Sequence, residues 1–407
     1  MGLTSVLARW ASKRVHVLII EVPGWGASRM LLEAELDRRG WAVALSPADA
    51  DLLAVCGMPG EELRAACDFV WNQLPGPRAR VNVTGSGSLS TLLNEASAHL
   101  GDDSAQREDA RSRSQNTVAE DSAPDAGEHD GMAPEEMDHG SMDHGMDHGE
   151  MDMPMPGGIP LAEGGDDRDG LEMDFLTVPF GPVMPHWPAG LVVDCVLQGD
   201  VVVSAQARVL EAVSAPTEVS TEEMTYLVEA RLRIIRLCDH ASQLLALAGW
   251  QTAAQNARRL RDDARWSADI AEHVAPLDRL RRRVERSVLL RWSLKGISLG
   301  GISVGRPVGG TDALAEAGAA TPADQAGVAI RDRLIGWLHE AAALAATSSD
   351  TRSPAAGDLD RAREARDLLG ALPALLRGTE LGTARLLIAG LGLDTAALAP
   401  AHERTHD

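Results

Sequence analysis

The stretch VHVLIIEVPGWGASRMLLEAELDRRG, residues 15–40, decides the fold of the first part of the chain. Its first eight residues are mostly apolar, which is typical of a buried strand, and the turn residues Pro23, Gly24 and Gly26 follow. The rest of the stretch places apolar residues near helical spacing before Gly40, which supplies a stop. The stretch therefore predicts a strand followed by an amphipathic helix.

The same alternation of short apolar runs and amphipathic segments continues to about residue 98. Apolar runs predict further strands at 41–46, 51–57 and 79–85, and the pattern GEELRAACDFVWNQL predicts a helix at 60–74. Strands that alternate with helices favour a parallel sheet with helices on its faces. We expect an α/β domain at residues 13–100, built as a doubly wound, mostly parallel sheet.

Acidic residues concentrate in one segment of the chain. The 407 residues carry a formal charge of −22, and the segment from Gly101 to Asp174 holds 22 Asp and Glu against four Arg. That segment has a charge of −18, which leaves −4 for the remainder. It contains almost no aliphatic residues, so it cannot bury enough apolar surface to offset the entropy of ordering. We expect a disordered acidic linker at residues 101–172, and the net charge argues against nucleic acid as a partner.

The pattern changes again after this segment. Two extended stretches surround the turn sequence QGD, residues 198–200, and predict a small β-hairpin region. Helical periodicity follows, with helices expected near 221–248, 250–272, 276–294, 325–346, 358–377 and 379–390. We expect a mainly α domain at residues 173–400, while the role of residues 350–407 stays open.

Two segments resemble subunits of known complexes. GWAVALSPADADLLAVCGMPGEELRAACDFVWNQLPGPRARVNVTG, residues 40–85, resembles the 20 kDa subunit of respiratory complex I and the small subunit of nickel-iron hydrogenases. VPFGPVMPHWPAGLVVDCVLQGDVVVSAQARVLEA, residues 178–212, is similar to the start of the 49 kDa or hydrogenase large subunit, and EARLRIIRLCDHASQLLALAGWQ, residues 229–251, to one of its helices. Because these subunits pack against each other, the resemblance implies a fusion of the two.

The residues that hold cofactors in those families are missing here. The two loops that would carry cluster cysteines, PGWGASR (23–29) and TGSGS (84–88), contain none, although an iron–sulfur cluster needs thiolate ligands. Met184 stands where the large-subunit motif has a histidine, and no C-x-x-C exists for a nickel-iron centre. The plainer interpretation of His186 is a turn residue and that of His240 a packed or surface residue. We therefore expect no iron–sulfur cofactor and no catalysis by the chain itself.

Cysteine usage and the N-terminus indicate the compartment. The four cysteines, Cys56, Cys67, Cys195 and Cys238, have no metal-ligand spacing, and three of them lie in apolar runs, which favours buried free thiols. The apolar run near the N-terminus is too short to span a membrane. We expect a cytoplasmic protein without a membrane span, at most peripheral to the inner face of the cell membrane.

Three copies of Met-Asp-His-Gly lie within residues 137–149. Imidazole suits copper, nickel and zinc, while the soft thioether sulfur of methionine prefers cuprous copper. The repeat resembles the Met-Asp-His runs of copper-resistance proteins, and the alternative is a solvated acidic spacer. The predicted metal ligands are His129, His139, His144 and His148 together with Met137, Met142, Met146 and Met151.

These features lead to two principal hypotheses. The first is a non-catalytic subunit or assembly protein that docks onto subunits of a membrane oxidoreductase or ion-translocating complex. The second is a protein that binds, stores or delivers copper or nickel through the linker. A redox enzyme with an unfamiliar cofactor is a third and remote hypothesis. The basic stretch RLRRRVERSVLLRW, residues 279–292, predicts a helix that faces solvent, an acidic partner or the linker.

Overall fold

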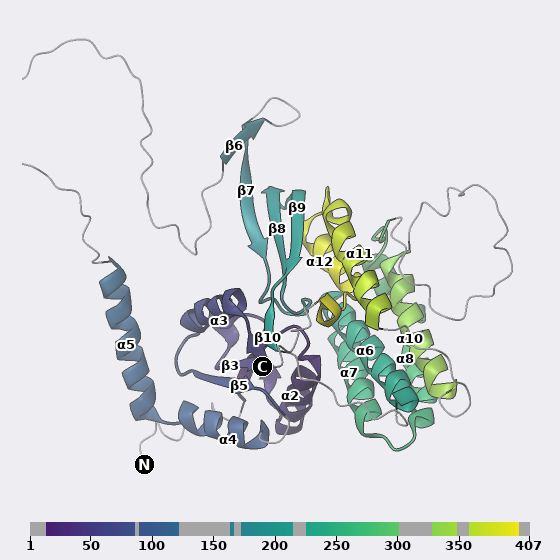
Figure 1. Cartoon of the computed structure of the whole chain (residues 1–407), viewed down its shortest axis with the longest axis horizontal. Helices are drawn as coiled ribbons and strands as arrows, with labels where there is room; N and C mark the ends of the chain where they lie inside the picture. Colours follow the sequence, from purple (N-terminus) through teal and green to yellow (C-terminus); the bar gives the residue numbers. More distant parts are fainter. Residues whose placement is uncertain are drawn as a thin grey trace, which may run out of the picture.

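The computed structural model describes residues 14–85, 89–121, 163–166, 172–214, 225–300, 328–347 and 358–398 (Figure 1). An α/β unit comes first, an antiparallel sheet follows, and helices make up the rest (Figure 1). The predicted fold class is confirmed at this level: a parallel-sheet α/β region precedes a mainly helical part that carries an antiparallel hairpin sheet.

The α/β unit is built on a four-stranded parallel sheet in the order β2-β1-β3-β5. Its strands and helices are β1 (His16–Glu21), α2 (Gly26–Arg39), β2 (Ala42–Val43), β3 (Leu52–Cys56), α3 (Glu61–Gln73), β5 (Ala79–Val83) and α4 (Leu89–Leu100). The predicted order of strands and helices is confirmed. The helix α4 was not predicted from the sequence, and it packs its buried leucines on the sheet.

Both faces of this sheet are covered because its strands are apolar on both sides. Leu52, Ala54 and Cys56 of β3 pack in one core with α2 and α4, while Leu53 and Val55 pack in another with α3. Successive side chains of a strand point to opposite faces, so a continuous apolar run fills two cores at once. The run 51–57 thus explains why helices lie on both sides of the sheet.

A close contact between a glycine and a tryptophan fixes the start of α2. Gly57, just after β3, has φ 115°, and a Cβ atom placed there would lie 2.4 Å from Cγ of Trp25. Trp25 is 5% exposed and directly precedes α2. Only glycine allows both the backbone conformation and this approach. The contact therefore holds the first turn of α2 against the end of the sheet.

The prediction that residues 101–172 lack regular structure was wrong for part of that range. Residues Asp103–Asp121 form the helix α5, and Glu163–Asp166 form the strand β6. The Asp102 carboxylate caps α5, since Oδ1 accepts hydrogen bonds from the backbone N–H groups of Ser104 and Ala105 at 3.0 and 3.2 Å. Arg78 anchors the helix through two hydrogen bonds to Asp109, at 2.9 and 3.0 Å. Local capping and ion pairs thus supply the stability that an apolar face would otherwise provide.

The second sheet is antiparallel, in the order β6-β7-β8-β9. Its longer strands are β7 (Glu172–Phe180), β8 (Leu191–Gln198) and β9 (Val201–Val209). Gly199, with φ 62°, and Asp200 form the turn between β8 and β9, so the predicted hairpin is confirmed. The short strand β10 (Ala212–Ser214) pairs with β4 (Met58–Pro59), which ties this region to the α/β unit.

One large core joins β8 and β9 to the helices. The helices are α6 (Thr225–Leu247), α7 (Gln251–Trp266), α8 (Val274–Arg286), α9 (Val288–Ser293), α10 (Ile330–Thr347), α11 (Asp358–Leu376) and α12 (Leu381–Leu391). The predicted helix at 276–294 is interrupted at Ser287, whose hydroxyl caps α9. Buried leucines of α11 and α12 share this core, so residues 358–398 belong to the helical part.

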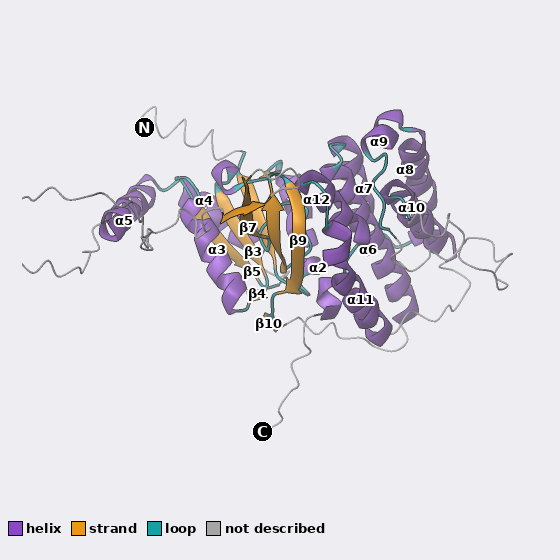
Figure 2. Ribbon diagram, turned by 90° about the horizontal axis from the view of Figure 1, so that it is seen from above, coloured by secondary structure: helices purple, strands orange, loops and turns teal. Residues whose placement is uncertain are grey.

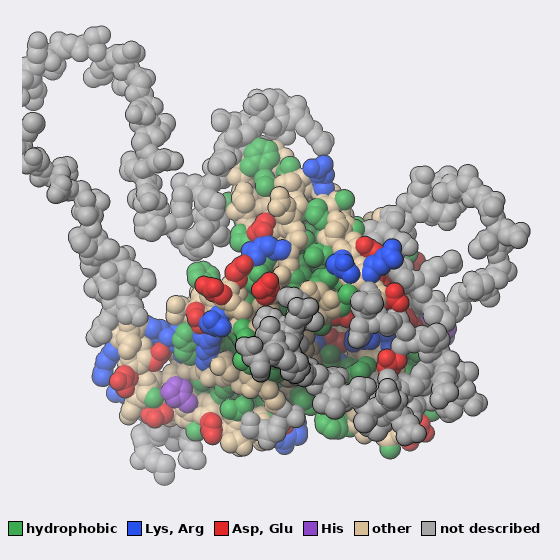
Figure 3. Space-filling view, viewed as in Figure 1, with side chains coloured by type: hydrophobic (Ala, Val, Ile, Leu, Met, Phe, Trp, Pro, Cys, Tyr) green, Lys and Arg blue, Asp and Glu red, His purple; other side chains and the backbone are tan. Residues whose placement is uncertain are grey.

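The helices α6 to α12 lie together at one end of the molecule, and α3 and α4 lie towards the opposite end, with strands of both sheets between (Figure 2). Acidic and basic side chains are interspersed on the face seen in Figure 3. This distribution agrees with the sequence, which assigns most of the excess negative charge to residues 101–174.

Candidate functional site

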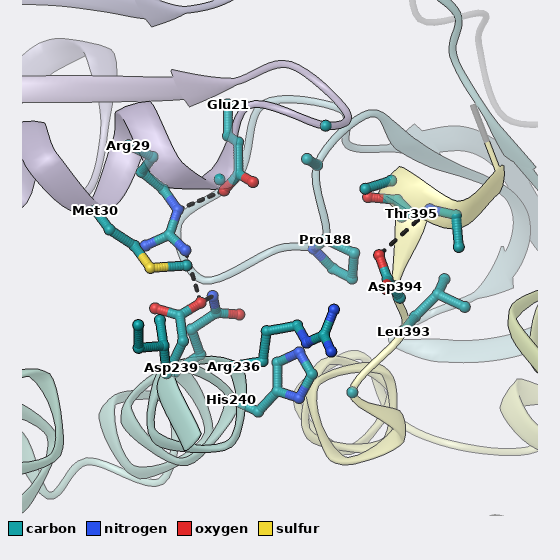
Figure 4. Close-up of a pocket in the computed structure, with 18 of the residues that line it drawn as sticks. Glu21, Arg29, Met30, Pro188, Arg236, Asp239, His240, Leu393, Asp394 and Thr395 are labelled. Atoms are coloured by element: carbon teal, nitrogen blue, oxygen red, sulfur yellow. Dashed lines mark hydrogen bonds and ion pairs between the residues drawn. The ribbon is translucent and has the colours of Figure 1, made fainter. Parts of the chain in front are cut away.

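A cavity of about 1050 Å³ lies where the α/β unit meets the helical part. Its wall includes the end of β1, the start of α2, the loop 187–189, one face of α6 and the segment that follows α12. Figure 4 shows Arg29 on the α/β side facing Asp239, Arg236 and His240 of α6, with Asp394 across the same space. Segments that are more than 350 residues apart in sequence therefore form one site.

The helix α6 supplies the largest share of the wall, and its wall residues recur at helical spacing. The α6 side chains that line the cavity are Arg231, Leu232, Ile235, Arg236, Asp239, His240 and Gln243. They follow the i, i+4, i+8 pattern of one helix face, while Ile234, Cys238 and Ala241 point into the core. Because α6 faces the core on one side and the cavity on the other, the two sets of residues interleave.

Buried ion pairs cross the boundary between the two parts beside this cavity. We call Glu21, Arg29, Glu33, Asp239 and Arg261 the interface ion cluster. The Nη2 atom of Arg29 donates to Oδ2 of Asp239 at 2.6 Å, and its Nη1 donates to Oε1 of Glu33 at 2.9 Å. The Nη1 atom of Arg261 donates to Oε2 of Glu33 at 2.6 Å and to Oδ1 of Asp239 at 2.7 Å.

Further contacts extend the cluster, among them an ion pair from Nε of Arg261 to Oδ1 of Asp262 at 2.8 Å. The Nε atom of Arg29 also donates to Glu21, and the side-chain amide of Gln243 donates to Oδ2 of Asp239 at 2.9 Å. Arg261 is only 1% exposed and Asp239 only 5%. A buried charge is tolerated only when it is paired and hydrogen-bonded, so each partner depends on the others. The cluster thus fastens α2 of the α/β unit to α6 and α7 of the helical part.

Burial and the guanidinium groups act in opposite directions on the carboxyls of the cluster. Burial raises the pKa of Glu21, even with Arg29 beside it. Burial also opposes ionisation of Glu33, but Arg29 and Arg261 lower its pKa to about 2. The same two arginines, acting against burial, hold the pKa of Asp239 well below its usual range. Of the three carboxyls of the cluster, Glu21 is therefore the one that most readily takes up a proton.

The rest of the cavity wall combines apolar and cationic groups. The further charged residues are Arg231, Arg236, Arg265, Arg361 and Asp394, and the larger apolar ones are Met30, Trp187, Leu232, Ile235, Ile388 and Leu393. Arginines thus outnumber carboxylates around the cavity. Such a lining suits a ligand with an apolar body and a negatively charged or polar end.

The two histidines discussed from the sequence occupy different places. His240 lines the cavity, and its ring centroid lies 5.4 Å from that of Trp337. Burial lowers its pKa to about 4, so the imidazole is neutral at pH 7. His186 is not among the residues of the cavity wall; it lies in the loop between β7 and β8 with φ 57°, and burial lowers its pKa to about 4 as well.

The cysteines do not come together as cluster ligands would. Cys56 and Cys67 pack on opposite faces of the parallel sheet, and Cys195 and Cys238 lie in the large core of the helical part. All four are free and buried, which was predicted for Cys56, Cys195 and Cys238 but not for Cys67. Burial raises the pKa of Cys67 and Cys195 to about 11 and that of Cys238 to about 12, so the thiols stay protonated. None of the described residues in the cavity wall is a cysteine, and the thiols do not fit the iron–sulfur cluster of the resembled family.

The predicted metal ligands lie outside the described residues. These are His129, His139, His144, His148, Met137, Met142, Met146 and Met151. In the part of the chain that the structure describes, no group of three or more His, Cys, Asp or Glu side chains is placed to hold a metal ion. The linker therefore remains the candidate metal site on its sequence alone.

The interface ion cluster was not predicted from the sequence. Asp239 follows Leu237 and Cys238 on a helix with a strongly apolar face, and a carboxylate beside such a face is a signal for a buried charge that needs a partner. The sequence does not show which partner it takes, because Arg29 is 210 residues away.

Comparison of the chain with protein-family models, curated proteins and solved structures found no match. Among the residues that the structure describes, no helix combines the length and the apolar character needed to cross a bilayer.

Proposed function

We propose that the protein is a non-catalytic subunit or assembly protein of a membrane-associated complex that resembles NADH-quinone oxidoreductase or a hydrogenase. On this proposal the chain unites counterparts of the 20 kDa and 49 kDa subunits. The observation that carries it is the interface ion cluster, because Arg29 of the α/β unit and Asp239 of the helical part pair through buried atoms 2.6 Å apart. A contact of this kind is expected where two subunits that once packed together have become one chain.

The arrangement of the thiols supports a role without electron transfer. The cysteines are distributed over three separate cores, so a four-iron cluster has no ligand set among the described residues. On this proposal the scaffold would be retained without the cofactor. The proposed role is therefore to shape or complete an assembly.

A pull-down from membranes tests this proposal. The tagged full-length chain, expressed in the cells that make it, is purified from gently solubilised membranes, and the recovered proteins are identified by mass spectrometry. We expect respiratory or hydrogenase-like subunits in excess over an untagged control. Recovery of the tagged chain without any such subunits would contradict the proposal, as would unchanged assembly of these complexes in cells that lack the protein.

A second candidate function is copper or nickel binding by the linker, favoured by the three Met-Asp-His-Gly repeats. Several weak sites on one tether raise the retention of an ion through effective concentration. We expect cuprous copper to bind the full chain and binding to be lost when residues 137–155 are deleted. Isothermal titration calorimetry under anaerobic conditions measures both.

A second deletion provides the control for the copper titration. Residues 303–321 form a stretch of equal length that contains no His, Met or Cys, so their removal should leave copper binding unchanged. Equal binding by the chain without 137–155 and by the full chain would rule out the linker as the site.

A further inference from the structure

The outward face of α8 is a row of arginines. Leu277, Leu280 and Val284 are buried, and the exposed positions between them carry Arg279, Arg282, Arg283 and Arg286. The four arginines line a groove of about 480 Å³ together with Trp250 and Ser287. The guanidinium of Arg283 lies 5.2 Å from the ring centroid of Trp250. No carboxylate is among the described residues that line this groove, although Asp278, just outside it, lies 3.9 Å from Arg282; the lining itself is positively charged.

An exposed apolar surface continues directly from this groove. Ser287 lines the groove, and its hydroxyl accepts a hydrogen bond from the backbone N–H of Leu290 at 3.2 Å, which starts α9. On α9 Leu289 is 78% exposed and Trp292 76% exposed, whereas Leu290 is buried. Val288, 64% exposed, lies on the same short helix, and apolar side chains that gather in one exposed patch can mark a site of interaction.

We propose that α8 and α9 together form a docking site for the surface of an anionic phospholipid membrane. The arginines of α8 would bind lipid phosphates, while Leu289 and Trp292 would enter the interfacial region. Tryptophan and leucine next to basic side chains are the combination that favours a helix lying in a membrane interface. This proposal does not rest on the proposed function, since it uses residues outside the cavity.

A lipid surface is favoured because anionic headgroups above an apolar interface match both the arginines of the groove and the exposed Leu289 and Trp292. The acidic segment 101–174, which carries eight methionines, is the alternative occupant, and vesicle binding by the full-length chain, which contains that segment, tests against it. The helices α8 and α9 also lie at the end of the molecule farthest from α3 and α4 (Figure 2).

Vesicle sedimentation with the full-length chain tests the proposal. Vesicles of phosphatidylcholine alone are compared with vesicles of phosphatidylcholine and phosphatidylglycerol, each at low and at high salt. We expect binding to the anionic vesicles only, and weaker binding at high salt. The double variant Arg282→Gln, Arg286→Gln should bind about 30-fold more weakly. The double variant Leu289→Ser, Trp292→Ser should lose at least about tenfold.

Matched controls come from α3 at the opposite end of the molecule. Arg64→Gln and Phe69→Ser change an exposed arginine and a half-exposed aromatic residue there, and both should bind as the unaltered chain does. All the changed side chains are exposed, so thermal melts should confirm intact folds. Absence of binding to anionic vesicles would overturn the proposal, and so would equal binding by the two double variants and the unaltered chain.

Discussion

Replacement of Arg261 by Met is expected to lower the free energy of unfolding by about 3–5 kcal/mol. Arg261 is 1% exposed and pairs with Glu33, Asp239 and Asp262. Its loss leaves Glu33 and Asp239 paired only with the guanidinium of Arg29 and removes the ion pair to Asp262. Methionine fills much of the volume of the arginine side chain, and the effect therefore reports the charge rather than a cavity. Urea unfolding of the full-length chain, followed by circular dichroism, measures the change.

Arg281 offers a matched control on the surface. It pairs with Asp278 and Glu285 on its own helix and remains 22% exposed, so Arg281→Met should cost less than about 1 kcal/mol. The double variant Arg261→Met, Asp239→Asn should lose less stability than the sum of the losses in the two single variants. The reason is that Asp239→Asn removes a carboxylate that Arg261→Met would otherwise leave without one of its partners. An Arg261→Met chain as stable as the Arg281→Met chain would show that the cluster does not hold the two parts together.

The sequence predicts the α/β unit well because its strands are buried on both faces. The runs 15–22 and 51–57 are mostly apolar, and their short length and flanking glycines favour strands over helices. The hairpin could be predicted equally well, because a glycine, Gly199, stands between two extended stretches where the turn requires a positive φ. The helix α5 could not be predicted in this way. Its stability comes from the Asp102 cap and from the ion pair with Arg78, and neither can be recognised in a segment whose composition is charged throughout.

The site could not be predicted to the same extent. The periodicity of α6 indicates that the helix has an apolar face. The role of Asp239 as an ion-pair partner becomes clear only from the packing of α2 against α6, which brings Arg29 to it. Arg29 and Glu33 are one helical turn apart on α2, which is also typical of a solvated surface pair. Pairing across 210 residues depends on how the two cores are placed, and local pattern carries no information about that placement.

Stability should depend on pH in two opposite ways because of the same cluster. Glu33 has a folded-state pKa of about 2 against an ordinary value of 4.5, so its ionised form stabilises the fold above pH 4.5. That contribution, about 3 kcal/mol, is lost as the pH falls from about 4.5 towards 2. The pKa of Asp239 is lowered too, which adds a loss of the same sign. Glu21 has a raised pKa, so the fold gains stability as the pH falls through that value towards 4.5.

Two isosteric variants separate these contributions. Glu33→Gln should flatten the loss of stability below pH 4.5, whereas Glu21→Gln should remove the gain above it and leave the acid limb unchanged. Urea midpoints measured from pH 7 down to pH 2 give both profiles. Identical pH profiles for Glu33→Gln and the unaltered chain would mean that Glu33 is not held ionised by Arg29 and Arg261. Opposite effects of the two variants on the pH profile of stability would show two things. Arg29 and Arg261 keep Glu33 charged, while burial leaves Glu21, on the cavity wall, able to accept a proton.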